Sequence, residues 1–182
     1  KIHQNGYTHI WYTGLIAHAT QTVYPNLPQD NPEVVKGKAG SPYAIKDYYD
    51  VDPDLATITK NRMQEFEALV ERTHKAGLKM LIDFVPNHVS RQYHSIARPK
   101  GTSDLGQNDD ITKAFDSTNN FYYCPNEPLK LNNILGHEGS YKESPAKATG
   151  NDRFDAQPNK NDWYETIKLN YGVNYFDNRS KH

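Results

Sequence analysis

The stretch of residues 78–90, Leu-Lys-Met-Leu-Ile-Asp-Phe-Val-Pro-Asn-His-Val-Ser, constrains the fold more than any other part of the chain. Its apolar run begins at Met80 and ends at Val85. The run is too short for a helix and rich enough in bulky residues to predict a buried strand. Pro86 has no N–H to give to a strand ladder, so we expect the strand to end about there.

Three polar residues sit at the end of this predicted strand. Asp83 lies near its carboxyl end, and Asn87 and His88 follow just beyond it. Parallel α/β sheets and barrels build their sites at that end, because the loops there converge on one face. The alternative is structural: Asp83 caps the next turn and His88 is an ordinary loop histidine.

The preceding residues predict a helix that leads into the strand. Asn61 is a candidate N-cap and Gly77 a left-handed stop. Between them, apolar side chains recur at spacings of three and four and form one stripe: Met63, Phe66, Leu69, Val70 and Thr73. Residues 7–13 are aromatic and β-branched and predict an earlier strand. A strand, a helix and a second strand make a βαβ unit with parallel strands.

A long connection, residues 14–60, separates the predicted first strand from the helix. Connections of this length inside a domain are usually functional or disordered. Its part at residues 41–53 holds three tyrosines, whose rings can stack on sugars, and three aspartates, which can accept hydroxyl hydrogen bonds. This composition suits a sugar site, and the alternative is a surface turn with solvated acids.

Composition limits the remaining possibilities. Hydrophobic residues make up 36% of the 182 residues and mean hydropathy is −0.89, which is low for a barrel with strands buried on both faces. The net charge of −1 gives no reason to propose nucleic acid or an anionic membrane as partner. Cys124 is the single cysteine, so no intrachain disulfide forms. No run is long enough to span a membrane.

Residues 91–168 carry Pro, Gly and Asn in quantity and no helical period, so we expect a loop-rich region. Its aromatic groups at 121–123 and 163–164 are candidate sugar contacts, with a small aromatic core as the alternative favoured about two to one. His94 and His137 have no neighbours at metal-ligand spacing and are expected at the surface.

The hexapeptide at 83–88, Asp-Phe-Val-Pro-Asn-His, resembles the first signature of the α-amylase family of glycoside hydrolases, family 13, at the end of the third barrel strand. Residues 6–16 resemble the family's second strand, although Gly14 stands where a proline is usual. Residues 42–53 resemble a loop in which a tyrosine and an Asp-x-Tyr precede Val-Asp-Pro. Residues 167–170, Ile-Lys-Leu-Asn, resemble the motif near the end of the inserted second domain.

The resemblance implies an α/β fold: a partial (β/α)8 TIM barrel with a loop-rich inserted domain after the third strand. It divides the chain into residues 1–90, a partial catalytic barrel with strand 2, helix 2 and strand 3; residues 91–168, the inserted domain; and residues 169–182, a return segment toward the barrel. A full barrel needs about 250 residues, so the chain is expected to be an internal piece of a larger protein.

The resemblance also implies roles for single residues. Tyr43 is expected to be the aromatic platform under the sugar at the cleavage subsite. His88 is expected to hydrogen-bond the same sugar, and this contact strengthens as positive charge develops in the sugar ring. Asp83 is similar to the family's supporting carboxylate, which holds neighbouring site residues.

Calcium is implied more weakly. Asn87 aligns with an asparagine that ligates calcium in many members, and its oxygen suits a hard cation. In calcium-binding amylases an acidic residue helps to hold the ion, and Lys168 stands at that place here. The lysine resembles instead the neopullulanase and cyclomaltodextrinase type of sequence, although Ile167 replaces a proline.

The catalytic carboxylates of the family come from the fourth and fifth barrel strands. Retaining glycosidases need two carboxyl groups roughly 5 Å apart. Residues 175–182 imitate the fourth-strand signature, but Arg179 follows Asp177 instead of preceding it, so Asp177 is rejected as the nucleophile.

We therefore expect a fragment of a retaining hydrolase of starch, maltooligosaccharides or pullulan, with no turnover of its own. The expected partners are an α-glucan and the remainder of the parent barrel. The alternative is a catalytically inactive domain that binds or interacts, as in the heavy chains of amino-acid transporters. A free-standing sugar-binding module is a third possibility. The compartment stays open, with export favoured because family members with this chemistry are often exported.

Overall fold

The computed structural model describes residues 1–134 and 136–177. In chain order its elements are η1 (His3–Asn5), β1 (His9–Tyr12), β2 (Ile16–His18), η2 (Pro32–Val34), β3 (Ile45–Val51), η3 (Pro53–Leu55), η4 (Thr59–Asn61), α1 (Arg62–Lys75), β4 (Lys79–Ile82), β5 (His88–Ser90), β6 (Tyr123–Cys124), β7 (Ala146–Lys147) and β8 (Thr166–Lys168). The strands pair two by two and close no barrel within the described residues. No helix in this part of the chain combines the length and apolar character needed to cross a bilayer.

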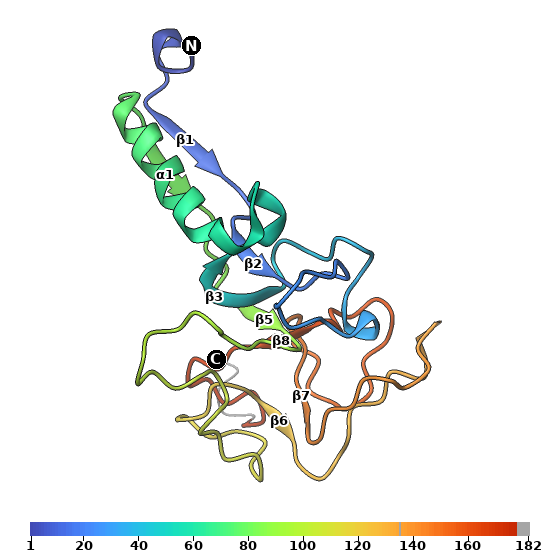
Figure 1. Ribbon diagram of the computed structural model, residues 1–182. Coiled ribbons are helices and arrows are strands. Elements are labelled where there is room, and N and C mark those ends of the chain that lie inside the picture. The colour runs from blue at the N-terminus through green and yellow to red at the C-terminus, as the bar shows by residue number, and fades with distance from the viewer. Residues whose placement is uncertain (135, 178–182) are drawn as a thin grey trace.

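The predicted βαβ unit is present at one end of the molecule (Figure 1). β1 and β4 are parallel, with Trp11 opposite Leu81, and α1 connects toward β4 through Gly77 at φ +75°. The predicted cap is wrong, because the Asn61 side chain makes no cap hydrogen bond. The Glu65 carboxylate instead accepts the N–H groups of residues 57 and 58, at 2.8 and 2.9 Å.

The prediction of a buried strand at the centre of the sequence is also wrong. Leu81 is 50% exposed and Ile82 47% exposed. β4 pairs only with β1 among the described strands, and that register stops at Tyr12 opposite Ile82. The strand therefore ends before Asp83 rather than near the proline.

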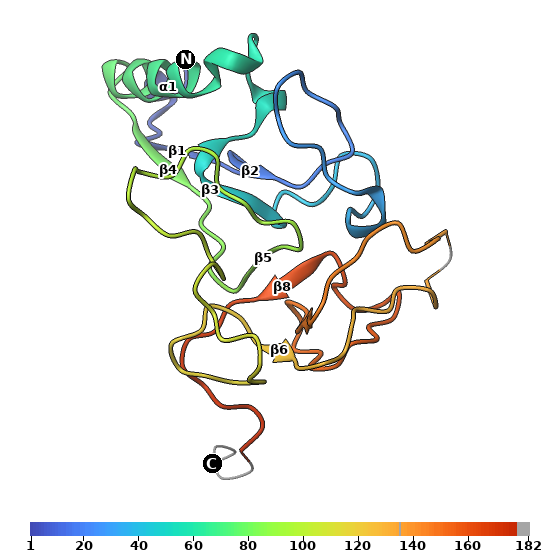
Figure 2. The ribbon, with the colours of Figure 1, turned by 60° about the horizontal axis from the view of Figure 1, so that its bottom comes forward.

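The connection at residues 14–60 is partly ordered as an antiparallel pair, β2 with β3, which lies between the βαβ unit and the rest (Figure 2). The three aspartates at residues 41–53 are buried, so the alternative of a surface turn with solvated acids is wrong. Asp47 accepts the N–H groups of Tyr49 and Ile96, at 2.9 and 2.8 Å. Asp50 binds Arg62, and the remaining aspartate is described below with its histidine partner.

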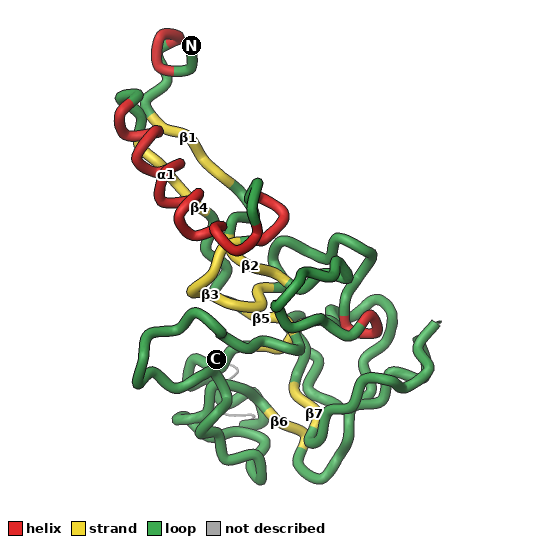
Figure 3. Tube along the Cα trace, in the orientation of Figure 1, coloured by secondary structure: helices red, strands yellow, loops and turns green. Residues whose placement is uncertain are grey.

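Loops dominate the second half of the chain (Figure 3), as predicted for residues 91–168. β5 pairs with β8 in antiparallel register, His88 opposite Lys168. The two strands share a core of five buried side chains: Val89, Phe121, Tyr123, Ile167 and Leu169. Aromatic residues 121–123 and Tyr164 are buried, in agreement with the core alternative. The division of the chain at residues 90 and 168 stays a prediction.

Candidate functional site

Tyr43 and His88, two of the predicted site residues, line one cavity of about 430 Å³. Three segments build it: the loop before β3, the chain from Val85 to the first residue of β5, and the chain that ends in the first residue of β8. The other lining residues are Lys36, Ser41, Val85, Trp163, Glu165 and Thr166. The structure thus brings together residues that are far apart in the sequence.

His88 is fixed at the start of β5, so the alternative of an ordinary loop histidine is wrong. Its Nδ1 atom lies 2.9 Å from the Asn87 side-chain nitrogen, which also donates to the Gly150 carbonyl at 2.9 Å. Only glycine fits at position 150, because a Cβ there would lie 2.5 Å from Thr166 Oγ1 and 2.9 Å from the His88 side chain. The close backbone approach therefore holds the imidazole ring in place.

The protonation of His88 follows from its surroundings. Burial lowers the pKa of the imidazole, a hydrogen bond with the Tyr43 backbone raises it, and the Lys168 ammonium lowers it, with a lowered pKa as the result. The ring is therefore neutral at neutral pH. Because the Asn87 amide nitrogen can only donate, Nδ1 accepts its hydrogen bond and the proton of the neutral ring resides on Nε2.

Tyr43 presents its ring to solvent, with 46% of its surface exposed. The loop that carries it is fixed by Gly40, at φ +72°, where a Cβ would lie 1.8 Å from the Ala19 carbonyl oxygen. The Tyr43 N–H donates to Ser41 Oγ at 3.3 Å. A held backbone under an exposed ring is what stacking on an apolar ligand face requires.

Asp83 lies outside this cavity. Its Oδ1 accepts a hydrogen bond of 2.6 Å from the indole N–H of Trp11, and its Oδ2 is buried without a hydrogen-bond partner among the described residues. The structure thus connects Asp83 to β1 and not to Tyr43 or His88.

The donors around Asn87 do not fit calcium. Lys168, opposite His88 in the β5–β8 pair, has its ammonium 2.6 Å from Asp152 Oδ1 and 5.5 Å above the Tyr175 ring. A cation already neutralises the nearby carboxylate, and a second would be repelled. Residues 1–134 and 136–177 hold no group of three His, Cys, Asp or Glu side chains placed for a metal.

The two charged residues of the lining were missed by the sequence reasoning. Lys36 and Glu165 form an ion pair of 3.1 Å inside the cavity. Lys36 lies in the long connection and offered no sequence signal. Glu165 stands just before the motif at 167–170, and that position could have drawn attention to it. Trp163, named as either a sugar contact or a core residue, is 44% exposed and lines the cavity.

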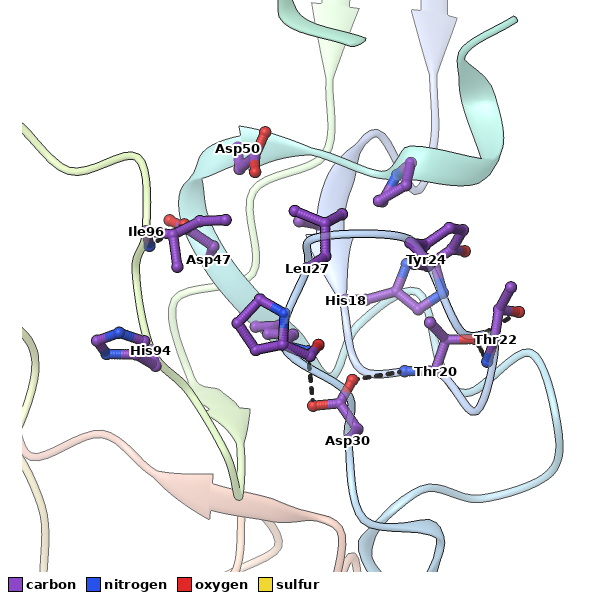
Figure 4. A pocket seen from close by; sticks show the side chains of 14 residues that line it. His18, Thr20, Thr22, Tyr24, Leu27, Asp30, Asp47, Asp50, His94 and Ile96 are labelled. Carbon is purple, nitrogen blue, oxygen red and sulfur yellow. Dashed lines mark hydrogen bonds and ion pairs between the residues drawn. The ribbon is translucent and has the colours of Figure 1, made fainter. Parts of the chain in front are cut away.

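A second cavity, of about 40 Å³, lies beside β2 and β3 (Figure 4). Its charged groups are paired within the chain: Lys46 lies 2.9 Å from Asp30, and His18 Nδ1 lies 2.5 Å from Asp52. His18 Nε2 bonds the Ala39 carbonyl at 3.0 Å. These pairs connect the loops around β2 to one another.

Comparisons with known proteins find one matching family model and several similar proteins. The family model for the α-amylase catalytic domain matches residues 2–166. An α-glucosidase of Culex pipiens is 38% identical over 67 residues, which are 35% of this chain and 11% of that relative. The amino acid transporter heavy chain SLC3A1 of Rattus norvegicus is 43% identical over 51 residues, 28% of this chain and 7% of that protein.

Among solved structures, an α-amylase from Lactobacillus plantarum matches with a TM-score of 0.36 and 29% identity, over 49% of this chain and 17% of that one. The chain spans 11% and 7% of the length of the two curated relatives above.

Proposed function

Because this chain belongs to the α-amylase family of glycoside hydrolases, we propose that its cavity at Tyr43 and His88 binds a glucose unit of an α-glucan. The family's catalytic domain is a TIM barrel, and the β1–α1–β4 unit is a part of that fold. One observation carries the proposal: an exposed tyrosine ring and a buried, fixed histidine share one cavity.

The chemistry of the two side chains suits this role. The exposed ring of Tyr43 offers an apolar face to the C–H face of a sugar. A neutral His88 in the same cavity does not repel the positive charge that a glycosidase transition state develops. In a protein with the catalytic carboxylates, these contacts would support a retaining hydrolysis of α-glucosidic bonds in starch, maltooligosaccharides or pullulan.

Within the described residues, the cavity lining includes a single carboxyl group, that of Glu165. A retaining mechanism needs two, about 5 Å apart. We propose that the 182-residue chain binds sugar and does not cleave it. Release of glucose or maltose from maltooligosaccharides by the purified chain would overturn this part of the proposal.

Binding is tested by titrating the purified chain with maltotriose in a calorimeter. We expect measurable affinity and a loss of about tenfold for Tyr43→Ala, because stacking on an aromatic ring contributes on the order of 1.4 kcal/mol. Tyr49→Ala is the matched control, because Tyr49 is similarly exposed but lies outside this cavity. Equal losses in both variants, or no binding to the parent chain, would contradict the proposal.

A second candidate function rests on the similarity to the transporter heavy chain. An inactive domain of this family that serves as an interaction partner has no requirement for a sugar contact at Tyr43. A chain that folds normally and binds no maltooligosaccharide would favour that function.

A further inference from the structure

The loop that carries Tyr43 is held at both ends by backbone hydrogen bonds. At one end, Ala19 donates its N–H to the Ala44 carbonyl at 2.9 Å. At the other end, the Lys38 carbonyl accepts the N–H of residue 21, also at 2.9 Å. A shift of the chain between these two bonds moves the tyrosine ring relative to the cavity that it lines.

His18 in β2, which lines the second cavity (Figure 4), provides a third contact with this loop. Its Nε2 lies 3.0 Å from the carbonyl oxygen of Ala39, a few residues before Tyr43. Its Nδ1 lies 2.5 Å from Oδ2 of Asp52, which follows β3. The side chains of His18 and Asp52 are 15% and 3% exposed, so the pair is largely shielded from solvent. One imidazole ring thus connects β2, the Tyr43 loop and the end of β3.

The two contacts of His18 require a proton on each ring nitrogen. A carbonyl oxygen and a carboxylate oxygen can only accept, so each needs an N–H from the nitrogen that faces it. A neutral imidazole has one N–H and would place a lone pair against one of the two oxygens. Only the charged ring satisfies both oxygens, and histidine can lose this proton near neutral pH.

The groups around His18 favour the charged ring. Burial lowers its pKa, but the hydrogen bond and charge of Asp52, the Ala39 carbonyl and the charge of Asp54 raise it, and the resulting pKa lies above 6.5. The ring is therefore mainly charged at pH 6.5, and it loses its proton as pH rises through the raised pKa. His88 titrates in a different range, because its pKa is lowered from 6.5.

The other titratable groups of the second cavity have their own partners or stay protonated. They are Tyr24, Asp30, Lys46, Asp47, Asp50 and His94. Asp30 forms an ion pair of 2.9 Å with Lys46. Asp50 binds Arg62, and Asp47 accepts backbone N–H groups. Burial raises the pKa of the Tyr24 phenol, which keeps its proton near neutral pH. His94 Nδ1 lies 2.7 Å from Asp104 Oδ2, and this second histidine serves as the control below.

Loss of the proton would release the loop rather than the carboxylate. A carboxylate is a stronger acceptor than a carbonyl, so the neutral ring keeps its N–H toward Asp52. The lone pair of Nε2 then faces the Ala39 carbonyl, and the third contact with the loop is lost.

We propose that His18 is a positioning residue for the sugar site: its charged ring holds the Tyr43 loop against β2 and Asp52, and loss of one proton weakens sugar binding as pH rises. This inference rests on the proposed function, because the sugar contact at Tyr43 is the property that the loop controls. His18 acts through the loop, since it lines a different cavity from Tyr43.

The test measures the maltotriose affinity of the 182-residue chain by calorimetry from pH 6.5 to about 9. For the parent chain we expect a fall of about fivefold along a one-proton curve, the effect of one lost hydrogen bond. Its midpoint should coincide with that of the His18 ring protons in an NMR titration. His18→Ala should bind weakly at every pH.

Asp52→Asn provides the sharper variant. The amide can donate to Nδ1, so a neutral ring keeps its N–H for the Ala39 carbonyl, and the affinity should no longer depend on pH. A purely structural role of His18 would give no such recovery. Thermal melting establishes that each variant is folded, and Asp52→Asn provides the answer if His18→Ala is not.

His94→Ala is the matched control, because His94 is an ion-paired histidine of the same cavity whose partner, Asp104, lies outside the Tyr43 loop. This variant should keep the profile of the parent chain, and loss of the profile here would assign the proton to His94 and overturn the inference. An affinity of the parent chain that is constant with pH, or an equal fall in Asp52→Asn, overturns this inference alone. No binding of maltotriose at any pH overturns the proposed function with it.

Discussion

The β1–α1–β4 unit and the loop-rich residues 91–168 differ in where their apolar side chains lie. The unit has the most regular secondary structure in the chain, yet Ile82 in β4 is 47% exposed. The loop-rich part has strands of two or three residues, yet Ile167 in β8 is 2% exposed. In this chain, the most regular secondary structure and the most deeply buried apolar side chains therefore lie in different regions (Figure 1).

The loop-rich part buries its core because side chains satisfy its backbone groups. The Glu33 carboxylate accepts the N–H groups of residues 138, 140 and 141, at 2.6, 3.1 and 3.0 Å. Asp109 accepts the N–H groups of residues 120 and 121, at 2.8 and 3.0 Å. These bonds do what a helix or a sheet ladder does elsewhere, since buried backbone groups must be paired.

Arg91 provides the strongest test of this contrast. Its guanidinium lies wholly buried, 2.7 Å from both Glu143 and the Tyr164 carbonyl and 2.9 Å from the Lys147 carbonyl. Arg91→Ala breaks a buried ion pair and leaves Glu143 only the more distant Lys147 ammonium, at 3.6 Å, so we expect a loss of about 3 kcal/mol in the free energy of unfolding. Urea denaturation followed by circular dichroism measures it.

The control for Arg91 is Lys75→Ala, which removes an exposed ion pair with Glu71 on α1. Exposed pairs contribute little, so its urea midpoint should remain near that of the parent chain. Equal losses in the two variants would show that the buried network adds nothing to stability.

Substitution of one isoleucine in each region compares how much apolar burial contributes to stability there. Ile167→Ala removes a buried side chain and should cost about 2–5 kcal/mol. Ile82→Ala changes an exposed one and should cost less than about 0.5 kcal/mol. The difference between the two free energies of unfolding is the measurement, and a larger loss for Ile82 would reverse the assignment of the core.

The sequence predicted the βαβ unit because its signals are local. Spacing of apolar residues along α1 and Gly77 at its end act over a few residues. The burial of β4 was predicted wrongly. An apolar run indicates that a strand can pack against another segment, but it does not identify a segment that does so. One partner of Asp47, Ile96, lies in a distant loop, and one partner of Asp50, Arg62, lies in α1, so the burial of these aspartates could not be predicted from the sequence around them.

Part of the candidate site could likewise be expected from the sequence. The resemblance led to Tyr43 and His88, which the structure places in one cavity. It also led to Asp83, which lies outside that cavity. Lys36 and Glu165 are more than a hundred residues apart in the sequence, and no periodic pattern predicts their contact.

The dependence of stability on acidic pH tests a single carboxylate that holds part of the loops. Although burial raises the pKa of the Glu33 carboxyl, the three N–H donors hold it lower, at about 2, below its ordinary 4.5. A lowered pKa contributes stability above pH 4.5, and this contribution disappears as pH falls through about 2.

Glu33→Gln removes this dependence. At pH 7 we expect the variant to unfold at lower urea concentration than the parent chain, with the gap narrowing as pH falls from 4.5 toward 2. Urea midpoints across this range, measured for both chains, give the result. A gap that stays constant with pH would mean that the carboxylate charge does not hold residues 138–141.

The smallest expected effect on stability is the difference between alanine substitutions of two asparagines, each of which precedes a helical turn. Asn31 accepts the N–H of Glu33 at 2.9 Å and so caps η2 in an irregular region, whereas Asn61 before α1 makes no such bond. Asn31→Ala should therefore lower the free energy of unfolding by about 1 kcal/mol, and Asn61→Ala by less than about 0.3. Thermal or urea unfolding of the two variants and the parent chain measures these differences. If Asn61 proved the more costly, the helix would depend on its own cap, and side-chain bonds to backbone would matter as much to the regular region as to the loops.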